Sequence, residues 1–160
     1  MILDQQLTLS TPNATAAANY DSVDVIDTQS VGGATAGGAR DLQSGEELYF
    51  FISIPTTWAG GTDAVFSLWG GANADKSGAG FIANLTNTLV RASGHLDAGR
   101  TYKASIPAGA PGSIGNTLPR YIFARAATTG TFTGTTNVAT VAIVHDVQDG
   151  RRFYASGFTA

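Results

Sequence analysis

The stretch that decides the fold is Leu118 to Asp146, which reads LPRYIFARAATTGTFTGTTNVATVAIVHD. Apolar residues alternate with small or polar ones near its start, at Tyr121 and Phe123, and again near its end, at Val141 and Ile143. This two-residue spacing is typical of strands that cover one apolar face. The residues between the two parts are small, polar and rich in threonine. The stretch therefore predicts a β-hairpin with a long polar tip.

The tip of this predicted hairpin, residues 128–137, contains a single aromatic residue, Phe132. An aromatic side chain without apolar neighbours in sequence must be buried against something non-local, either elsewhere in the fold or on a partner. Both alternatives indicate contact rather than chemistry. Trp58 stands in a comparable setting, in the turn sequence TTWAGGT, and is also a candidate for a partner contact.

Short apolar stretches separated by Gly and Pro turns occupy much of the remaining chain. Residues 48–54 are apolar on both faces and fit a buried central strand that Pro55 ends. Residues 64–69 and 101–106 fit further strands. Residues 78–92 have apolar positions at helical spacing, but their Asn and Thr content favours a strand. About eight or nine short antiparallel strands predict an all-β jelly roll or β-sandwich.

The first residues of the chain fit an extended segment. Residues 1–20 form either an N-terminal arm or a plain edge strand, and residues 21–160 form a single β-sandwich domain whose strands we expect from Val23 onward. If the arm grips a neighbour, its apolar side chains are the contacts, namely Ile2, Leu3, Leu7 and Leu9.

Five segments of the sequence, taken in order, resemble the cement (decoration) proteins of tailed-bacteriophage heads. These segments are MILDQQLTLS, VIDTQS, ARDLQSGEELYFFISI, IPAG and RYIFARAATTGTFTGTTNVATVAIVHD. The resemblance does not extend to residues 56–100 or to the residues after Gly150. It implies a jelly-roll domain on the outside of a capsid, where it staples neighbouring capsomers of a separate major capsid protein.

The resemblance also sets the expected partners and location. It implies a structural, non-enzymatic virion protein that is made in the host cytoplasm and binds the major capsid protein on the outer surface of the head. Because capsids have two-fold and three-fold axes, we expect self-association, as a homodimer in preference to a homotrimer. The candidate contact residues for the capsid or a second subunit are Ile2, Leu3, Leu7, Leu9, Trp58 and Phe132.

The composition is typical of a protein whose surface is largely covered by partner proteins. Charged residues make up 13% of the 160 residues, about half of the roughly 25% that is usual, and interface cores are depleted in charge. The net charge is −3 and the only adjacent basic pair is Arg151–Arg152, so we expect no nucleic-acid partner. The sequence has no apolar run of about 20 residues, so we expect no membrane partner.

The residues that could carry chemistry do not form a convincing site in the sequence. There is no cysteine, and no serine stands in a G-x-S-x-G motif. His95 lies in a Gly-rich turn, and His145 stands beside Asp146 at the end of a strand, where polar pairs are common. Residues 78–83 match a dinucleotide-binding pattern by spacing alone, without the strand and helix that it needs.

Three aspartates, Asp21, Asp24 and Asp27, recur every three residues and raise the question of a metal site. In a strand, Asp24 falls on the face opposite the other two, so the three do not converge. We therefore expect solvated strand edges, no metal and no cofactor.

An alternative function is a carbohydrate-binding jelly-roll module for host or surface recognition, because such a module could use a platform of aromatic side chains. Most of the candidates are flanked by apolar strand residues, which favours a place in the core instead. They are Tyr49, Trp69, Tyr102 and Tyr121.

Overall fold

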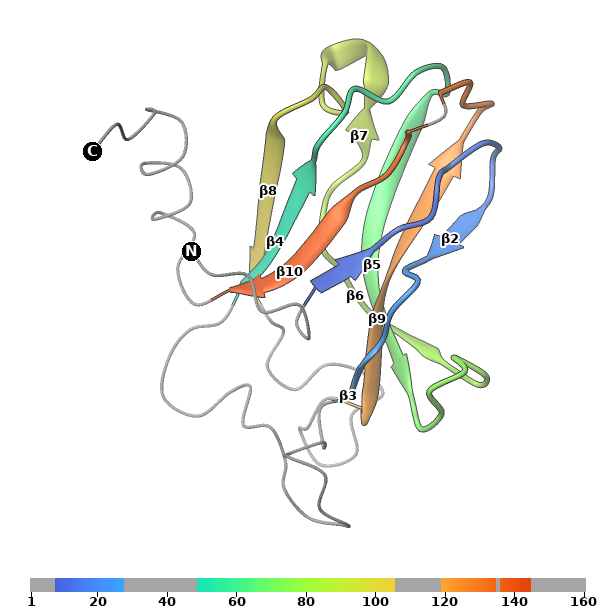
Figure 1. Ribbon diagram of the computed structural model, residues 1–160, viewed down its shortest axis with the longest axis vertical. Coiled ribbons are helices and arrows are strands. Elements are labelled where there is room, and N and C mark those ends of the chain that lie inside the picture. Colours follow the sequence, from blue (N-terminus) through green and yellow to red (C-terminus); the bar gives the residue numbers. More distant parts are fainter. Residues whose placement is uncertain (1–7, 28–48, 106–118, 135, 145–160) are drawn as a thin grey trace, which may run out of the picture.

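The computed structural model describes residues 8–27, 49–105, 119–134 and 136–144 (Figure 1). Within these ranges the chain forms ten β-strands, a single 3-10 turn called η2 (Arg91–Ser93), and no α-helix. The strands are β1 (Thr8–Ser10), β2 (Asn19–Asp21), β3 (Ile26–Asp27), β4 (Tyr49–Ile54), β5 (Asp63–Gly71), β6 (Gly80–Asn84), β7 (Leu89–Val90), β8 (Arg100–Ser105), β9 (Tyr121–Thr129) and β10 (Thr140–Val144).

The strands form two antiparallel sheets that pack as a sandwich. Sheet A has the order β1-β10-β4-β8, and sheet B has the order β2-β9-β5-β6, with β3 added on β9 and β7 added on β5. Four of the pairings nest inside one another along the chain: β1 with β10, β2 with β9, β4 with β8, and β5 with β6. A long antiparallel ribbon rolled into two sheets, as in a jelly roll, has this pairing, and the predicted all-β sandwich is confirmed.

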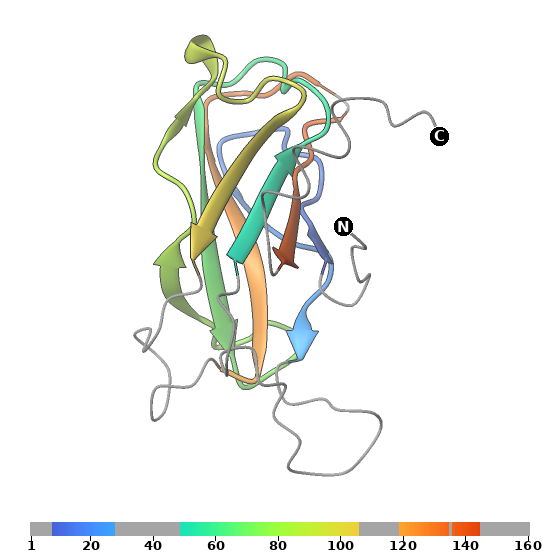
Figure 2. The ribbon, with the colours of Figure 1, turned by 90° about the vertical axis from the view of Figure 1, so that its left-hand side faces the viewer.

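The predicted hairpin over residues 118–146 is wrong in its pairing. Both of its strands exist, but β9 lies in sheet B and β10 lies in sheet A. The connection after Gly130 passes from one sheet to the other at the end of the sandwich that is uppermost in Figures 1 and 2. Hairpin loops usually have about two to five residues, and this longer connection can span the distance between two sheets.

Alternate burial, which the sequence pattern predicts, is clearest in β4. In β4, Phe50, Ile52 and Ile54 face the other sheet, while the residues between them are partly exposed. β9 turns Ile122 and Ala124 toward the same interior. The two inner faces together form one core, and the outer faces of strands such as β4 keep partly exposed side chains that can contact other molecules.

Residues 78–92 contain two strands, as we predicted, and no α-helix, although the last two of them begin the 3-10 turn η2. They form β6 and β7, which both pair with β5. Leu85 and Leu89 are buried, with exposed fractions of 5% and 4%. Their four-residue spacing arises because the chain leaves β6, passes along the edge of sheet B and returns to it as β7.

The N-terminal segment belongs to the sandwich as far back as the structure describes it. β1 is the edge strand of sheet A and pairs with β10. Leu9 lies in the core with an exposed fraction of 1%, and Ala14 is fully buried. Among the described residues the first strand is therefore β1, which precedes Val23, and β2 runs across the boundary that we predicted at residue 20. Within the described residues the edge-strand alternative holds.

A buried amide joins three loops at the upper end of the sandwich. The Asn137 side chain is fully buried. Its Oδ1 accepts a hydrogen bond from the Ala59 N–H at 2.9 Å, and its Nδ2 donates to the carbonyls of Ala14 and Gly134 at 2.9 and 3.0 Å. These partners come from the loops before β2, β5 and β10. Because each buried polar atom is satisfied, the loops form a fixed cap on the core.

Candidate functional site

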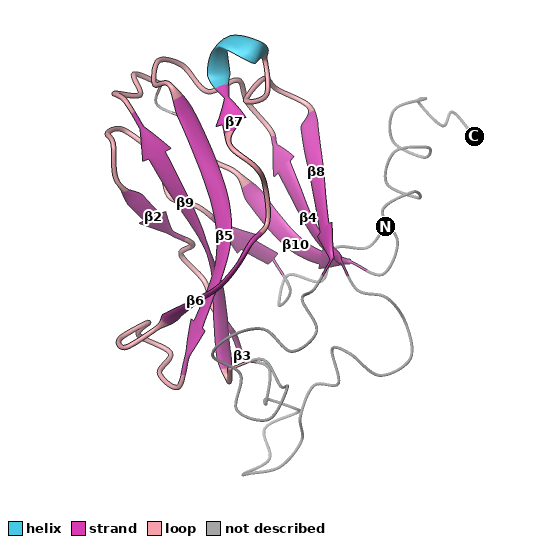
Figure 3. Ribbon diagram, turned by 180° about the vertical axis from the view of Figure 1, so that it is seen from behind, coloured by secondary structure: helices cyan, strands magenta, loops and turns pink. Residues whose placement is uncertain are grey.

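The outer side of sheet B carries a group of aromatic and arginine side chains that we call the aromatic face. It consists of Trp69 on β5, Phe81 on β6, and Tyr121, Phe123 and Arg125 on β9. Trp69 pairs in register with Phe81 on one side and with Phe123 on the other, so these three residues stand in a row on β6, β5 and β9, strands that are labelled in Figure 3. The rings of Trp69 and Phe81 meet edge to face, with centroids 5.9 Å apart and planes at 79°.

Arg125 is held at the centre of the aromatic face. Its guanidinium carbon lies 3.9 Å from the centre of the Trp69 ring and 5.8 Å from that of Phe123. Its Nε and Nη2 donate to the two carboxylate oxygens of Asp21, at 2.5 and 3.0 Å. These hydrogen bonds raise the pKa of Arg125 above its ordinary value. The result is a planar, charge-balanced group that stacks on a ring and has little freedom to move.

A second arginine pair extends the face toward β3. Arg120 donates to the carboxylate of Asp27 at 3.2 Å, and its guanidinium carbon lies 4.9 Å from the centre of the Tyr121 ring. The hydrogen bond from Arg120 to Asp27 raises the pKa of Arg120. Two of the three aspartates that raised the question of a metal therefore bind arginines across β9.

The tip of the β5–β6 hairpin covers one ring of the face and leaves the others accessible. The Lys76 ammonium lies 5.6 Å from the centre of the Phe123 ring, and it donates to the Ser22 carbonyl. Phe123 is 1% exposed, whereas Phe81 is 46% exposed. Trp69 and Tyr121 are half-buried. Aromatic and arginine side chains with balanced charge are the residues that protein interfaces favour at their centres.

The structure corrects three of the predicted contact residues. Leu9, Trp58 and Phe132 have exposed fractions of 1%, 0% and 2%, so their side chains have no surface to offer a partner. The rings of Trp58 and Phe132 meet edge to face, with centroids 5.4 Å apart and planes at 87°. Phe132 thus takes the first alternative that its sequence left open, burial elsewhere in the fold. The remaining predicted contacts, Ile2, Leu3 and Leu7, lie outside the described residues.

Trp58 is buried because its turn folds back over the core. Its indole Nε1 donates to the Val138 carbonyl at 3.0 Å, and its backbone N–H donates to the Leu96 carbonyl at 3.0 Å. Beside it, Gly61 has a φ of +64°, and a Cβ built there would overlap the Phe132 ring. Glycine at this position therefore lets the aromatic ring lie directly on the backbone of the turn.

For several aromatic residues our prediction of core or surface was the opposite of what the structure shows. Trp69 and Tyr121 were expected in the core, but they are half-buried and lie on the outside of sheet B. Strand parity is the signal that could have placed Trp69. In β5, Phe66 and Leu68 are fully buried on the inner side, so a residue one position further must point outward.

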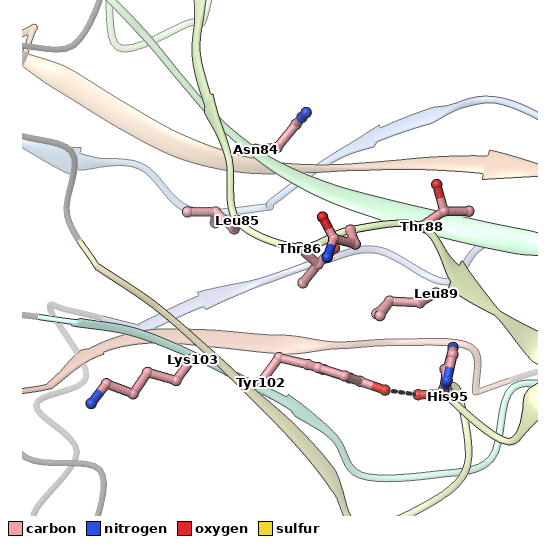
Figure 4. A pocket seen from close by; sticks show the side chains of 9 residues that line it. Asn84, Leu85, Thr86, Thr88, Leu89, His95, Tyr102 and Lys103 are labelled. Carbon is pink, nitrogen blue, oxygen red and sulfur yellow. Dashed lines mark hydrogen bonds between the residues drawn. The ribbon is translucent and has the colours of Figure 1, made fainter.

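A groove of about 450 Å³ lies at one open edge of the sandwich, between the two sheets (Figure 4). Residues 84–89, which connect β6 to β7, line it on the side of sheet B. His95, Tyr102 and Lys103 line it on the side of sheet A. The Tyr102 hydroxyl donates to the His95 carbonyl. The aromatic face and this groove are the two surfaces on which a binding role can be argued.

The other candidates for chemistry gain no support from the geometry. His95 uses its Nδ1 to accept a hydrogen bond from the Val90 N–H at 3.2 Å, and His145 and Asp146 lie outside the described residues. Among the residues that the structure describes, no three His, Asp or Glu side chains are close enough together to hold a metal ion. In the same residues, no helix is long and apolar enough to cross a membrane.

Comparison with known proteins leaves the family open. No protein-family model matches the sequence, and no curated protein matches it.

Proposed function

We propose that this protein is a structural virion protein that binds the outer surface of a phage capsid and cements neighbouring capsomers of the major capsid protein. The sequence resemblance to cement proteins supports this proposal. The jelly-roll architecture supports it as well, because it is common among viral capsid domains. The observation that carries the proposal furthest is the aromatic face, which gives the domain a preformed contact surface.

The composition of the aromatic face suits docking onto another protein. Phe81, 46% exposed, stands beside the half-buried Trp69. Arg125 is already paired with Asp21. A partner that covers the face therefore does not bury an unpaired arginine charge there, which would cost binding free energy. The row of rings lies on strands of one sheet and is fixed before binding, which limits the entropy that association costs.

Binding to the assembled shell would stabilise the head by mass action. A protein that binds the shell but not the free capsid subunits shifts the assembly equilibrium toward the shell. Many copies on a symmetric lattice add avidity, so individually modest contacts suffice. Within this proposal the protein associates with itself, as a homodimer in preference to a homotrimer, because a closed assembly can match a capsid axis. Light scattering on the purified protein tests this association.

The test of the proposal is addition of the purified protein to phage heads that lack it. We expect stoichiometric binding and an increased resistance of the heads to heat. A variant with both Trp69→Ala and Phe81→Ala should lose about 2 kcal/mol or more of binding free energy, which is about a thirtyfold rise in Kd.

The matched control is Val23→Ala, which trims an apolar side chain that is 68% exposed and lies outside the aromatic face. This variant should bind heads as the unmodified protein does. The proposal fails if the unmodified protein does not bind the heads. If the double variant is folded and binds as tightly as the control, the capsid contact does not involve the aromatic face.

A further inference from the structure

The groove at the edge of the sandwich has the chemistry of a binding site for a small neutral molecule. Its volume of about 450 Å³ lies within the range of ligand pockets, about 300 to 1,000 Å³. Leu85 and Leu89 are almost fully buried and form its apolar wall on the side of sheet B. Across from them lies the Tyr102 ring, between the two sheets (Figure 4). A ligand in the groove would therefore contact the Tyr102 ring on one side and the small exposed parts of Leu85 and Leu89 on the other.

The groove presents no charged group to a ligand. Among the residues that the structure describes, no Asp, Glu or Arg lines it, and Lys103 is the only charged residue along it. In β8, Lys103 follows the inward-facing Tyr102, so its side chain lies on the outer side of sheet A and points away from the groove (Figure 4). Its ammonium lies 3.6 Å from the centre of the Tyr49 ring. Anionic and cationic ligands thus find no opposite charge within the groove.

Neutral hydrogen-bonding groups surround the apolar surface. Val90 donates to His95 Nδ1, which places the proton of the neutral imidazole on Nε2 as a donor. The Thr86 hydroxyl oxygen accepts from the Phe66 N–H at 3.1 Å, which leaves its own hydrogen as a donor. Asn87 and Thr88 are exposed, and their side chains make no hydrogen bond within the described part of the chain.

We propose that this groove binds a neutral saccharide. A pyranose ring has an apolar C–H face that packs on an aromatic ring or on leucines, and hydroxyl groups around its edge that both donate and accept. The groove offers the same two kinds of surface in the same arrangement, a Tyr and Leu interior with an amide and a hydroxyl at its border. A purely apolar ligand would not use the border, and a charged ligand would not find a partner in the interior.

The test is a screen of the full chain against an array of neutral and acidic glycans, followed by titration of the best neutral saccharide. We expect a Kd of about 1 mM or lower. The double variant Asn87→Ala with Thr88→Ala should weaken binding by about tenfold or more, since it removes two polar partners. It should keep the fold, because neither side chain has a partner within the described residues.

The matched control is Asn19→Ala with Thr129→Ala, which removes an exposed amide and an exposed hydroxyl from β2 and β9, away from the groove. It should leave saccharide binding unchanged. Binding of acidic glycans only, binding that the groove variant does not weaken, or no binding to any neutral glycan would overturn the proposal. Both double variants should still bind phage heads, so the result is independent of the proposed cement function.

Discussion

The replacement Phe132→Ala tests whether the ring at the end of the sandwich stabilises the domain or contacts a partner. Phe132 is 2% exposed, packs edge to face on Trp58 at 5.4 Å, and lies over Gly61. Truncating a buried phenylalanine costs about 3 to 5 kcal/mol, which includes the cavity that remains. About 0.5 to 1.5 kcal/mol of this loss comes from the aromatic pair itself.

The expected loss converts into a large shift of the melting temperature. With an unfolding entropy of about 2.1 cal/mol/K per residue, a chain of 160 residues carries about 0.34 kcal/mol/K. A loss of 3 to 5 kcal/mol therefore lowers the melting temperature by about 9 to 15 °C. Scanning calorimetry on the purified variant measures this shift, and denaturant titration checks the free energy independently.

The control is Phe81→Ala, the same truncation at a side chain that is 46% exposed. It should cost about 1 kcal/mol, roughly the value of its contact with Trp69, and lower the melting temperature by about 3 °C. The reasoning is refuted if Phe132→Ala melts within about 2 °C of the unmodified protein. If that variant also binds phage heads weakly, Phe132 is a contact residue after all.

Three further substitutions test the interior and the groove. Asn137→Ala should destabilise the domain by about 2 kcal/mol or more, because it removes the partner of the Ala59 N–H and of the buried Ala14 carbonyl, and denaturant titration measures the loss. Gly61→Ala should destabilise it through its positive φ and its overlap with the Phe132 ring. In the Phe132→Ala background the cost should fall to about 1 kcal/mol, the backbone part alone, and equal costs in both backgrounds would contradict the packing. Burial raises the pKa of Tyr102 above 10.0, so the unfolded chain releases this proton first and stability should decline as the pH rises above about 10. Tyr102→Phe should lose this part of the alkaline dependence, and unfolding at about pH 9 and pH 11 compares the two proteins.

The fold class could be predicted from the sequence because alternation and turn residues act locally. We assigned residues 48–54 and 64–69 to strands, and those of them that the structure describes lie in β4 and β5. The same local signals cannot say which strands pair. β9 and β10 are neighbours in sequence, yet each pairs with strands far away in the chain. Pairing depends on which apolar faces close the core together, and this is a property of the whole molecule.

The candidate contact residues show the same difference between what local sequence predicts and what depends on the whole fold. The isolated aromatic Phe132 was correctly expected to need a non-local partner, but only the folded chain shows that the partner is Trp58. Trp69 stands in an apolar strand, and its outward direction depends on which side of β5 the second sheet covers.

The sequence by itself determined that this protein is an all-β domain with alternating strands and few charges. It also indicated that several aromatic residues need contacts with residues distant in the sequence or with a partner. Tertiary structure alone decided which aromatics form the core and which form the aromatic face. The physical reason is that a strand has two equivalent sides until another sheet packs on one of them. Once sheet A covers Phe66 and Leu68, Trp69 must point to the outside, beside Arg125 and Phe81.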